Sequence, residues 1–219
     1  MAASRTDFYL LVHKGQRHAL FELSGRAGQL DSREDAARVD LVRDIDALIA
    51  ALLDHADKED EFLQPLIRES APEIAKRLEN EHSAVEAKVA ALQNATAIAL
   101  LEKAPEYDLA VYRALARFVA AYLSHLDLEE VGAMPALLET FDEMTLSGIQ
   151  RRIVAATAPS ILRYNLKAML PAATALERTE VLASLCARLG AAEIAELRAS
   201  LGGLVPALDW PIQDSATAA

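Results

Sequence analysis

The sequence predicts an all-α fold, and three observations support this prediction. Apolar residues recur three or four positions apart along almost the whole chain, and no stretch alternates apolar and polar residues as a half-buried strand does. Of the 219 residues, 53% are hydrophobic but only 5% are aromatic. Glycine and proline occur only eight times each, so residues that break helices are few. A chain of this length can bury one core and carry a helical appendage.

Two long helices are predicted in the first third of the chain. The first covers about residues 6–27 and ends at nearby glycines, and the second begins after residues 31–32 and continues to about residue 66. In the second helix the buried face is marked by Leu41, Ile45, Leu48, Leu52, Phe62 and Leu66. His55 and Glu59 fill the one long gap in this spacing, so we expect both side chains on the buried face.

Prolines open the next two predicted helices, because proline is tolerated in the first helical turn. The helix after Pro72 carries His82 on its apolar face. The helix after Pro105 leads at the same helical spacing to His125 and Glu129. The apolar positions that define this last face are Val111, Leu115, Phe118 and Tyr122.

Beyond residue 140 the helical pattern continues in shorter pieces without any histidine. The predicted pieces are 142–157, 159–169, 175–189 and 191–201. We therefore expect two domains, a helical bundle over residues 1–140 and a C-terminal helical extension over residues 141–219. The extension is a candidate surface for homo-oligomers or a protein partner.

The charge distribution limits the classes of partner. The formal net charge is −11 and the isoelectric point is about 4.9, with no cluster of lysine and arginine. We therefore expect no binding to nucleic acid or to an anionic membrane. The chain starts without a basic region followed by a long apolar run, and it has one cysteine, so we expect a cytoplasmic protein.

The histidines show which faces carry polar chemistry. His13 and His18 lie roughly 140° apart on the first helix. His13 shares its face with apolar residues, whereas His18 shares its face with Lys14, Gly15 and Glu22 and is expected to face water. Each of the four long helices thus places one histidine on its buried face, and two helices add a glutamate one turn later. The candidate ligands are His13, His55, Glu59, His82, His125 and Glu129.

Burying four imidazoles and two carboxylates without compensation would cost several kcal/mol each. A metal centre removes this cost. This set of nitrogen and oxygen donors suits two iron ions with room for an exogenous ligand, whereas a single tetrahedral zinc would leave two donors unused. The alternative without metal is a polar layer of histidine–glutamate hydrogen bonds.

These motifs resemble the hemerythrin-like (HHE cation-binding) family over about residues 6–140. The resemblance rests on His13, on H-x-x-x-E at residues 55–59 and 125–129, on E-H at residues 81–82, and on the flanking segments VHKGQRHALFEL, HADKEDEFLQP and HLDLEEVGAMP. It implies an up-down-up-down four-helix bundle around a non-haem di-iron centre. It also implies that Glu59 and Glu129 bridge the two metals.

Two departures separate the chain from the oxygen-carrying hemerythrins, which have a second histidine in the third helix and an acid five residues after the last histidine. Here Glu86 stands four residues after His82. Glu129 stands four residues after His125, with Glu130 as its competitor, and we prefer Glu129 because it shares the face of His125. The chain is therefore more similar to the bacterial and regulatory members of the family. Candidates for contacts that orient the ligands are Arg17 and Tyr122.

The resemblance leaves three functions open. The first is to bind or sense oxygen, or a related small oxidant such as nitric oxide or peroxide. The second is an enzyme that reduces or detoxifies such a species. The third is a regulatory or interaction module that metal merely stabilises.

Overall fold

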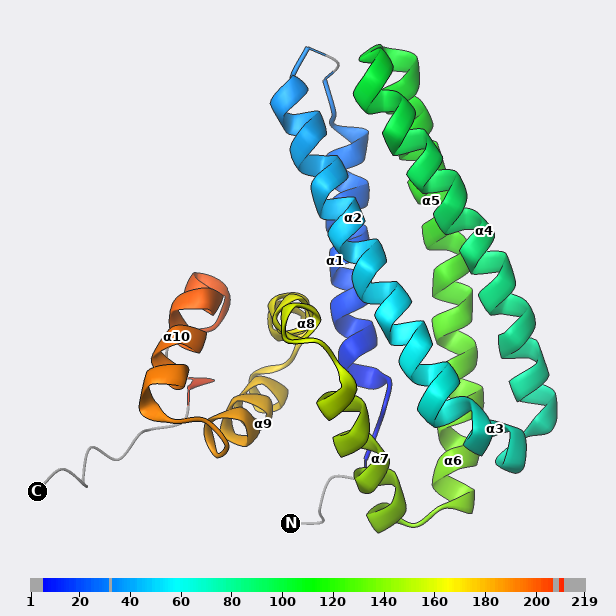
Figure 1. Ribbon diagram of the computed structural model, residues 1–219, viewed down its shortest axis with the longest axis vertical. Coiled ribbons are helices and arrows are strands. Elements are labelled where there is room, and N and C mark those ends of the chain that lie inside the picture. Colours follow the sequence, from blue (N-terminus) through cyan, green and yellow to red (C-terminus); the bar gives the residue numbers. More distant parts are fainter. Residues whose placement is uncertain (1–5, 32, 207–208, 211–219) are drawn as a thin grey trace, which may run out of the picture.

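The computed structural model describes residues 6–31, 33–206 and 209–210, and every regular element within these ranges is helical. Antiparallel packing of four long helices forms the body of the molecule (Figure 1). These helices are α1 (Leu10–Gly28), α2 (Asp35–Lys58), α4 (Pro72–Glu102) and α5 (Pro105–Leu128). The predicted all-α, up-down-up-down bundle with a C-terminal helical extension is confirmed.

The second and fourth long helices share an interruption that the sequence prediction did not include. In each, a short π-helical segment follows the long helix and a further α-helix continues in nearly the same direction (Figure 1). The segments are η1 (Glu59–Leu63) before α3 (Gln64–Ser70), and η2 (Glu129–Ala133) before α6 (Met134–Thr140). The repeated sequence motif therefore folds into a repeated α–π–α unit.

Proline gives a physical reason for the wider turn. In the first unit, the Gln64 N–H donates to the Glu59 carbonyl five residues earlier, and Pro65 follows at once. Proline has no N–H, and in a regular helix its ring clashes with the carbonyl four residues before it. A π turn just before the proline relieves this conflict. The second unit has the same bond from Met134 to Glu129, again followed by a proline.

The π turn corrects one detail of the predicted core. It adds one residue to the turn, so the buried position after Phe62 moves from Leu66 to Ile67. Ile67 is fully buried and Leu66 is only half-buried. The first helix is also shorter than predicted. It begins at Leu10, because the Asp7 carboxylate accepts hydrogen bonds from the first free N–H groups.

Four further helices follow the bundle, close to the predicted ranges. They are α7 (Glu143–Ala156), α8 (Pro159–Ala172), α9 (Ala175–Cys186) and α10 (Ala191–Leu201), with a 3₁₀ turn η3 (Gly202–Leu204). Helix α7 closes one end of the bundle, where Leu146 and Ile149 join an apolar cluster with Tyr9. Helices α8 to α10 enclose a small core of their own that includes Leu170 and Leu182.

A glycine allows the extension to pack on the bundle. A Cβ atom at Gly15 would lie 2.8 Å from the backbone nitrogen of Met169, so α8 crosses α1 too closely for any side chain there. Next to this crossing, Lys14 Nζ lies 2.6 Å from Glu177 Oε1. The prediction that Gly15 faces water with His18 is wrong, because α8 covers it. His18 itself is exposed. The domain boundary at residue 140 remains a prediction.

A buried ion pair joins α2 to α5, with Arg38 Nε 2.7 Å from Asp108 Oδ1. Within the described residues, α4 is the one helix whose length and composition would let it cross a membrane. Such a criterion is weak by itself, and in this structure α4 packs along α5 in the bundle.

Candidate metal centre

The six predicted ligands converge inside the bundle from four helices. Each long helix contributes one histidine, and each π segment begins with a glutamate. The contributors are His13 from α1, His55 from α2, Glu59 from η1, His82 from α4, His125 from α5 and Glu129 from η2. They form two groups, and within each group one donor atom per residue lies within 4.8 Å of the others.

The first group contains His13, His55 and one oxygen from each glutamate. His13 Nε2 lies 3.3 Å from His55 Nε2 and 3.4 Å from Glu129 Oε2. His55 Nε2 lies 3.1 Å from Glu59 Oε1. Two nitrogens and two oxygens therefore point to a common space.

The second group contains His82, His125 and the other oxygen of each glutamate. His82 Nε2 lies 3.9 Å from Glu59 Oε2, and His125 Nε2 lies 3.3 Å from Glu129 Oε1. Glu59 and Glu129 thus present their two oxygens to different histidine pairs. This arrangement gives two adjacent donor groups with the carboxylates between them.

Unpaired buried atoms test whether the residues fit a metal. Glu59 is 5% exposed and Glu129 is 1% exposed. Among the described residues, both carboxylate oxygens of Glu59, Oε2 of Glu129 and Nε2 of His82 are buried without a hydrogen-bond partner. Such a group costs about 1–3 kcal/mol when it is neutral and more when it is charged. Cations held by the donor atoms of the two groups would remove this cost, so the donors fit a metal centre.

The electrostatics of the carboxylates agree with a cation site. Burial and the nearby charge of Glu59 raise the pKa of Glu129 far above its ordinary value. Burial also acts to raise the pKa of Glu59, but the neighbouring His55 outweighs it and the pKa is lowered. Without metal, the surroundings therefore favour a proton on Glu129 over one on Glu59. A bound cation would oppose this protonation.

Glu130 and Arg17 fix the orientation of the His13 ring. His13 Nδ1 lies 2.9 Å from Glu130 Oε1, and Arg17 Nη1 donates to the same oxygen at 2.6 Å. The hydrogen bond from His13, together with Arg17, lowers the pKa of Glu130 to about 2. Because a carboxylate only accepts, Nδ1 carries the proton and Nε2 keeps its lone pair for a metal. Glu130 therefore lies beside the site as a partner of His13, and the donor groups contain Glu129 instead.

Two more acids lie beside the other histidine pair. His82 Nδ1 is 3.4 Å from Asp60 Oδ1, and His125 Nδ1 is 3.5 Å from Glu81 Oε2. Sequence reasoning gave Glu81 only as part of the E-H motif and did not single out Asp60, although each stands next to a predicted ligand in the chain. Glu86, the other acid considered in the third long helix, is exposed and belongs to neither donor group.

Two tyrosines line the centre. The Tyr122 hydroxyl donates to Gln16 Oε1 at 3.1 Å, and its ring centroid lies 5.9 Å from that of His125. The Tyr9 ring lies 5.1 Å from His13, and its buried hydroxyl has no partner among the described residues. Burial, followed by the charges of the two glutamates, raises the pKa of both tyrosines. Sequence analysis singled out Tyr122, whereas Tyr9 was not among its candidates.

The fold and the donor set define a helical-bundle protein with a metal-cation site. The family model of the hemerythrin HHE cation-binding domain matches residues 5–144. The match covers more than half of the chain, so this chain belongs to the hemerythrin HHE cation-binding family. Searches of curated proteins and of solved structures gave no significant match.

Proposed function

We propose that this centre is a non-haem di-iron site that binds or senses oxygen or a related small oxidant, such as nitric oxide or peroxide. The observation that supports two ions is the position of Glu59 and Glu129, whose oxygens face different histidine pairs. Iron suits a mixed set of imidazoles and carboxylates in a bundle core. One tetrahedral zinc would leave part of this set unused.

Each residue has a distinct task in this proposal. Bound iron would supply redox chemistry and open coordination positions for a small ligand. The four histidines hold the ions through Nε2, and Glu130, which is hydrogen-bonded to His13 Nδ1, fixes the orientation of that ring and increases its basicity as a ligand. The Tyr9 hydroxyl, which is buried and unpaired, is available to donate a hydrogen bond to a small ligand at the centre.

Metal analysis and optical spectroscopy test the proposal. The full chain is loaded anaerobically with ferrous iron, and the iron content is measured. We expect close to two iron ions per chain, and clearly fewer in His55→Ala and in Glu59→Ala. One zinc per chain without iron uptake would contradict the proposal.

Exposure of the loaded protein to oxygen then separates binding from turnover. A reversible change in the near-ultraviolet and visible spectrum is the expected result for binding or sensing. An irreversible change with a released product would assign the centre to an enzyme. No spectral change in an iron-loaded protein would leave metal with a stabilising role and contradict the binding proposal.

The net charge of −11 supports a further proposal about the environment of the protein. We propose a cytoplasmic location without binding to nucleic acid or to an anionic membrane. Partners on residues 141–219 also remain a proposal, and size-exclusion chromatography with light scattering tests self-association through this region.

A further inference from the structure

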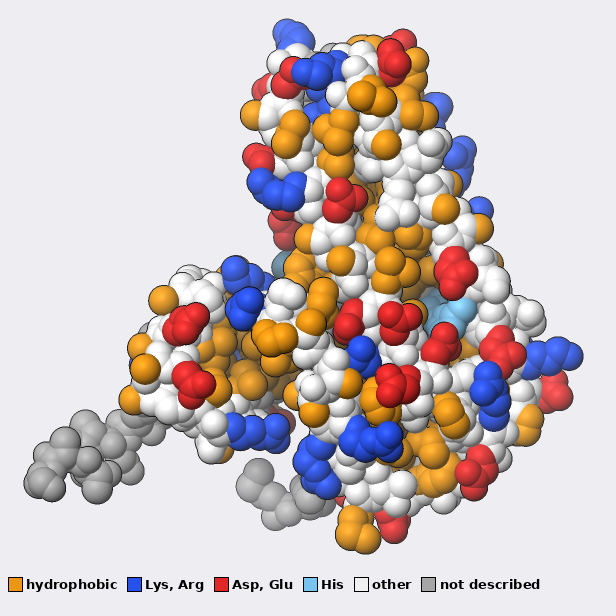
Figure 2. All heavy atoms as spheres, in the orientation of Figure 1, with side chains coloured by type: hydrophobic (Ala, Val, Ile, Leu, Met, Phe, Trp, Pro, Cys, Tyr) orange, Lys and Arg blue, Asp and Glu red, His pale blue; other side chains and the backbone are white. Residues whose placement is uncertain are grey.

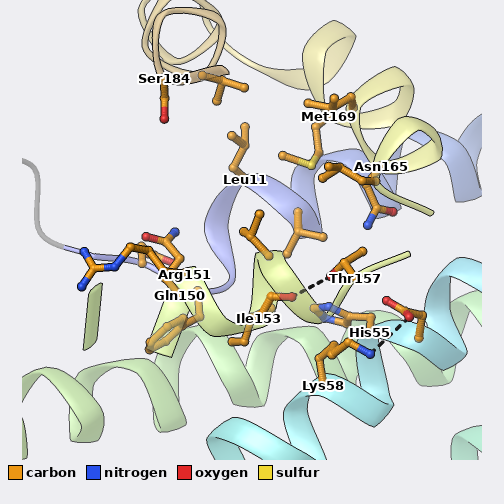
Figure 3. A pocket seen from close by; sticks show the side chains of 18 of the residues that line it. Leu11, His55, Lys58, Gln150, Arg151, Ile153, Thr157, Asn165, Met169 and Ser184 are labelled. Atoms are coloured by element: carbon orange, nitrogen blue, oxygen red, sulfur yellow. Dashed lines mark hydrogen bonds and ion pairs between the residues drawn. The ribbon is translucent and has the colours of Figure 1, made fainter. Parts of the chain in front are cut away.

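A cavity of about 350 Å³ lies between the bundle and the extension. Its walls come from α1, α7, α8 and α9, and one end is formed by the end of α2 and the start of η1 (Figure 3). His55 and Glu59, two members of the donor groups, line this end. The cavity therefore connects the C-terminal extension with the metal centre.

The cavity is too large for a diatomic ligand. A water molecule occupies about 30 Å³ in the liquid, so the cavity has the volume of roughly ten waters. It falls within the size range of pockets that bind organic molecules, about 300–1,000 Å³. Half of its lining residues are apolar and form most of the exposed wall, and they include Leu11, Val12, Ile153, Leu162, Leu166 and Met169. Such a wall favours an aliphatic chain over a polar metabolite.

The charges along the cavity differ between its two ends. At the inner end, the Lys58 ammonium lies 3.3 Å from the Asp54 carboxylate, so its charge is paired. Toward the other end, Arg151 and Arg188 line the cavity, are exposed, and have no ion-pair partner among the described residues. Figure 3 shows Arg151 and Ser184 well away from His55 and Lys58. Asp7 also lines the cavity, and its carboxylate accepts hydrogen bonds from the backbone N–H groups of Tyr9 and Leu10. The two guanidinium groups outnumber this acid, so the charge without an ion-pair partner along the cavity is positive on balance, although the whole chain is acidic.

We propose that this cavity binds a medium-chain aliphatic carboxylate. The carboxylate pairs with Arg151 and Arg188 at the opening, and the aliphatic chain extends along Leu11 toward His55. An organic cation would meet two unpaired guanidinium groups, and a neutral chain would gain no ion pair. The proposal concerns a site beside the metal centre and does not depend on which metal the centre holds.

Fluorescence titration of the full chain as purified tests the chemical class of the ligand. The probe is 11-(dansylamino)undecanoate, whose emission rises on transfer to an apolar site, and the competitors are decanoate and decyltrimethylammonium. We expect decanoate to displace the probe with an affinity about tenfold higher than that of the cation, the difference made by one or two charge-assisted bonds. Equal displacement by both competitors, or no probe binding, would overturn the proposal.

Two variants test the location of the site. Arg151→Gln combined with Arg188→Gln should weaken decanoate binding about tenfold. Ser184→Trp should abolish probe binding by filling the cavity, and because Ser184 is exposed on α9 the change spares the core. The matched control is Arg163→Gln on α8, because Arg163 is exposed and does not line the cavity. This variant should bind the probe and decanoate as the unchanged protein does.

Circular dichroism and metal content, measured on every variant, separate this proposal from the proposed function. Retained helicity and metal content with weakened binding in both cavity variants is the expected result. Unchanged binding in either cavity variant would overturn the cavity proposal alone. A purified protein that binds the probe but takes up no iron would contradict the di-iron proposal and leave the cavity proposal standing.

Discussion

Acidification should destabilise the metal-loaded protein far more than the metal-free protein. An imidazole binds metal only in its neutral form, and its ordinary pKa is about 6.5. In the loaded state the metal would hold the four predicted ligand histidines neutral, whereas in the unfolded chain they take up protons as the pH falls. Their contribution to stability is therefore present above about pH 6.5 and is lost as the pH falls.

For each histidine that is held neutral, the free energy of unfolding falls by about 1.4 kcal/mol for each pH unit below the pKa of histidine in the unfolded chain. Four such residues give a limiting slope of about 5 kcal/mol per pH unit.

In the metal-free protein, His13 and His55 make opposite contributions to the pH dependence of stability. Burial lowers the pKa of His13, so its contribution is lost as the pH falls. Burial also acts to lower the pKa of His55, but Glu59 outweighs it and the pKa is raised. The contribution of His55 is therefore present at low pH and is lost as the pH rises. These effects partly cancel, so the metal-free slope is shallower.

Melting curves followed by circular dichroism between pH 7 and pH 5 measure both forms. The metal-free form is prepared with a chelator, and iron release is measured over the same pH range. We expect a steeper fall of the melting temperature for the loaded form, accompanied by iron release. Parallel curves without iron release would refute the argument that these histidines act together as ligands.

Four substitutions test the metal centre and the packing of the bundle. Glu130→Gln keeps an acceptor for the His13 ring but removes the charge, and should lower metal affinity about ten- to a hundredfold in a competitive chelator titration. His13→Ala should reduce metal content in elemental analysis, whereas His18→Ala should leave it unchanged, and the reverse result would show that the wrong face of α1 was assigned. Asp108→Ala removes one of the two carboxylates paired with the buried Arg38 guanidinium, the other being Asp35, and should cost about 1–3 kcal/mol in chemical denaturation while metal content stays the same.

The faces that carry the ligands could be predicted because helix geometry fixes them. With a period of 3.6 residues, an apolar stripe that leads to His55 or His125 also sets the direction of those side chains. The π turns could not be read in this way, because their extra residue depends on a conflict between the backbone and Pro65 or Pro135. The predicted buried face therefore agrees with the structure as far as Glu59, and it shifts by one residue later in the helix, at Ile67.

The spacing of apolar residues along one helix does not predict which other helix that helix contacts. In the sequence, Glu81 looks like an ordinary charge on a solvated helix, and only the packing of α4 against α5 brings it to His125. Gly15 likewise looked water-facing, because a helical wheel of α1 contains no information about α8. The cavity could not be predicted for the same reason, because its walls combine α1 and the end of α2 with α7, α8 and α9, which come much later in the sequence.

The two histidine pairs of the centre meet different surroundings. The side chains of His55 and His82 are each 15% exposed. His55 lines the cavity, whereas His82 Nδ1 lies 3.4 Å from the exposed acid Asp60, and Figure 2 shows histidine surface framed by acidic side chains. Acidic groups raise the local concentration of cations, and an aliphatic wall favours apolar solutes. The acidic side thus favours the approach of hydrated metal ions, and the cavity side favours the approach of oxygen, nitric oxide or an aliphatic ligand.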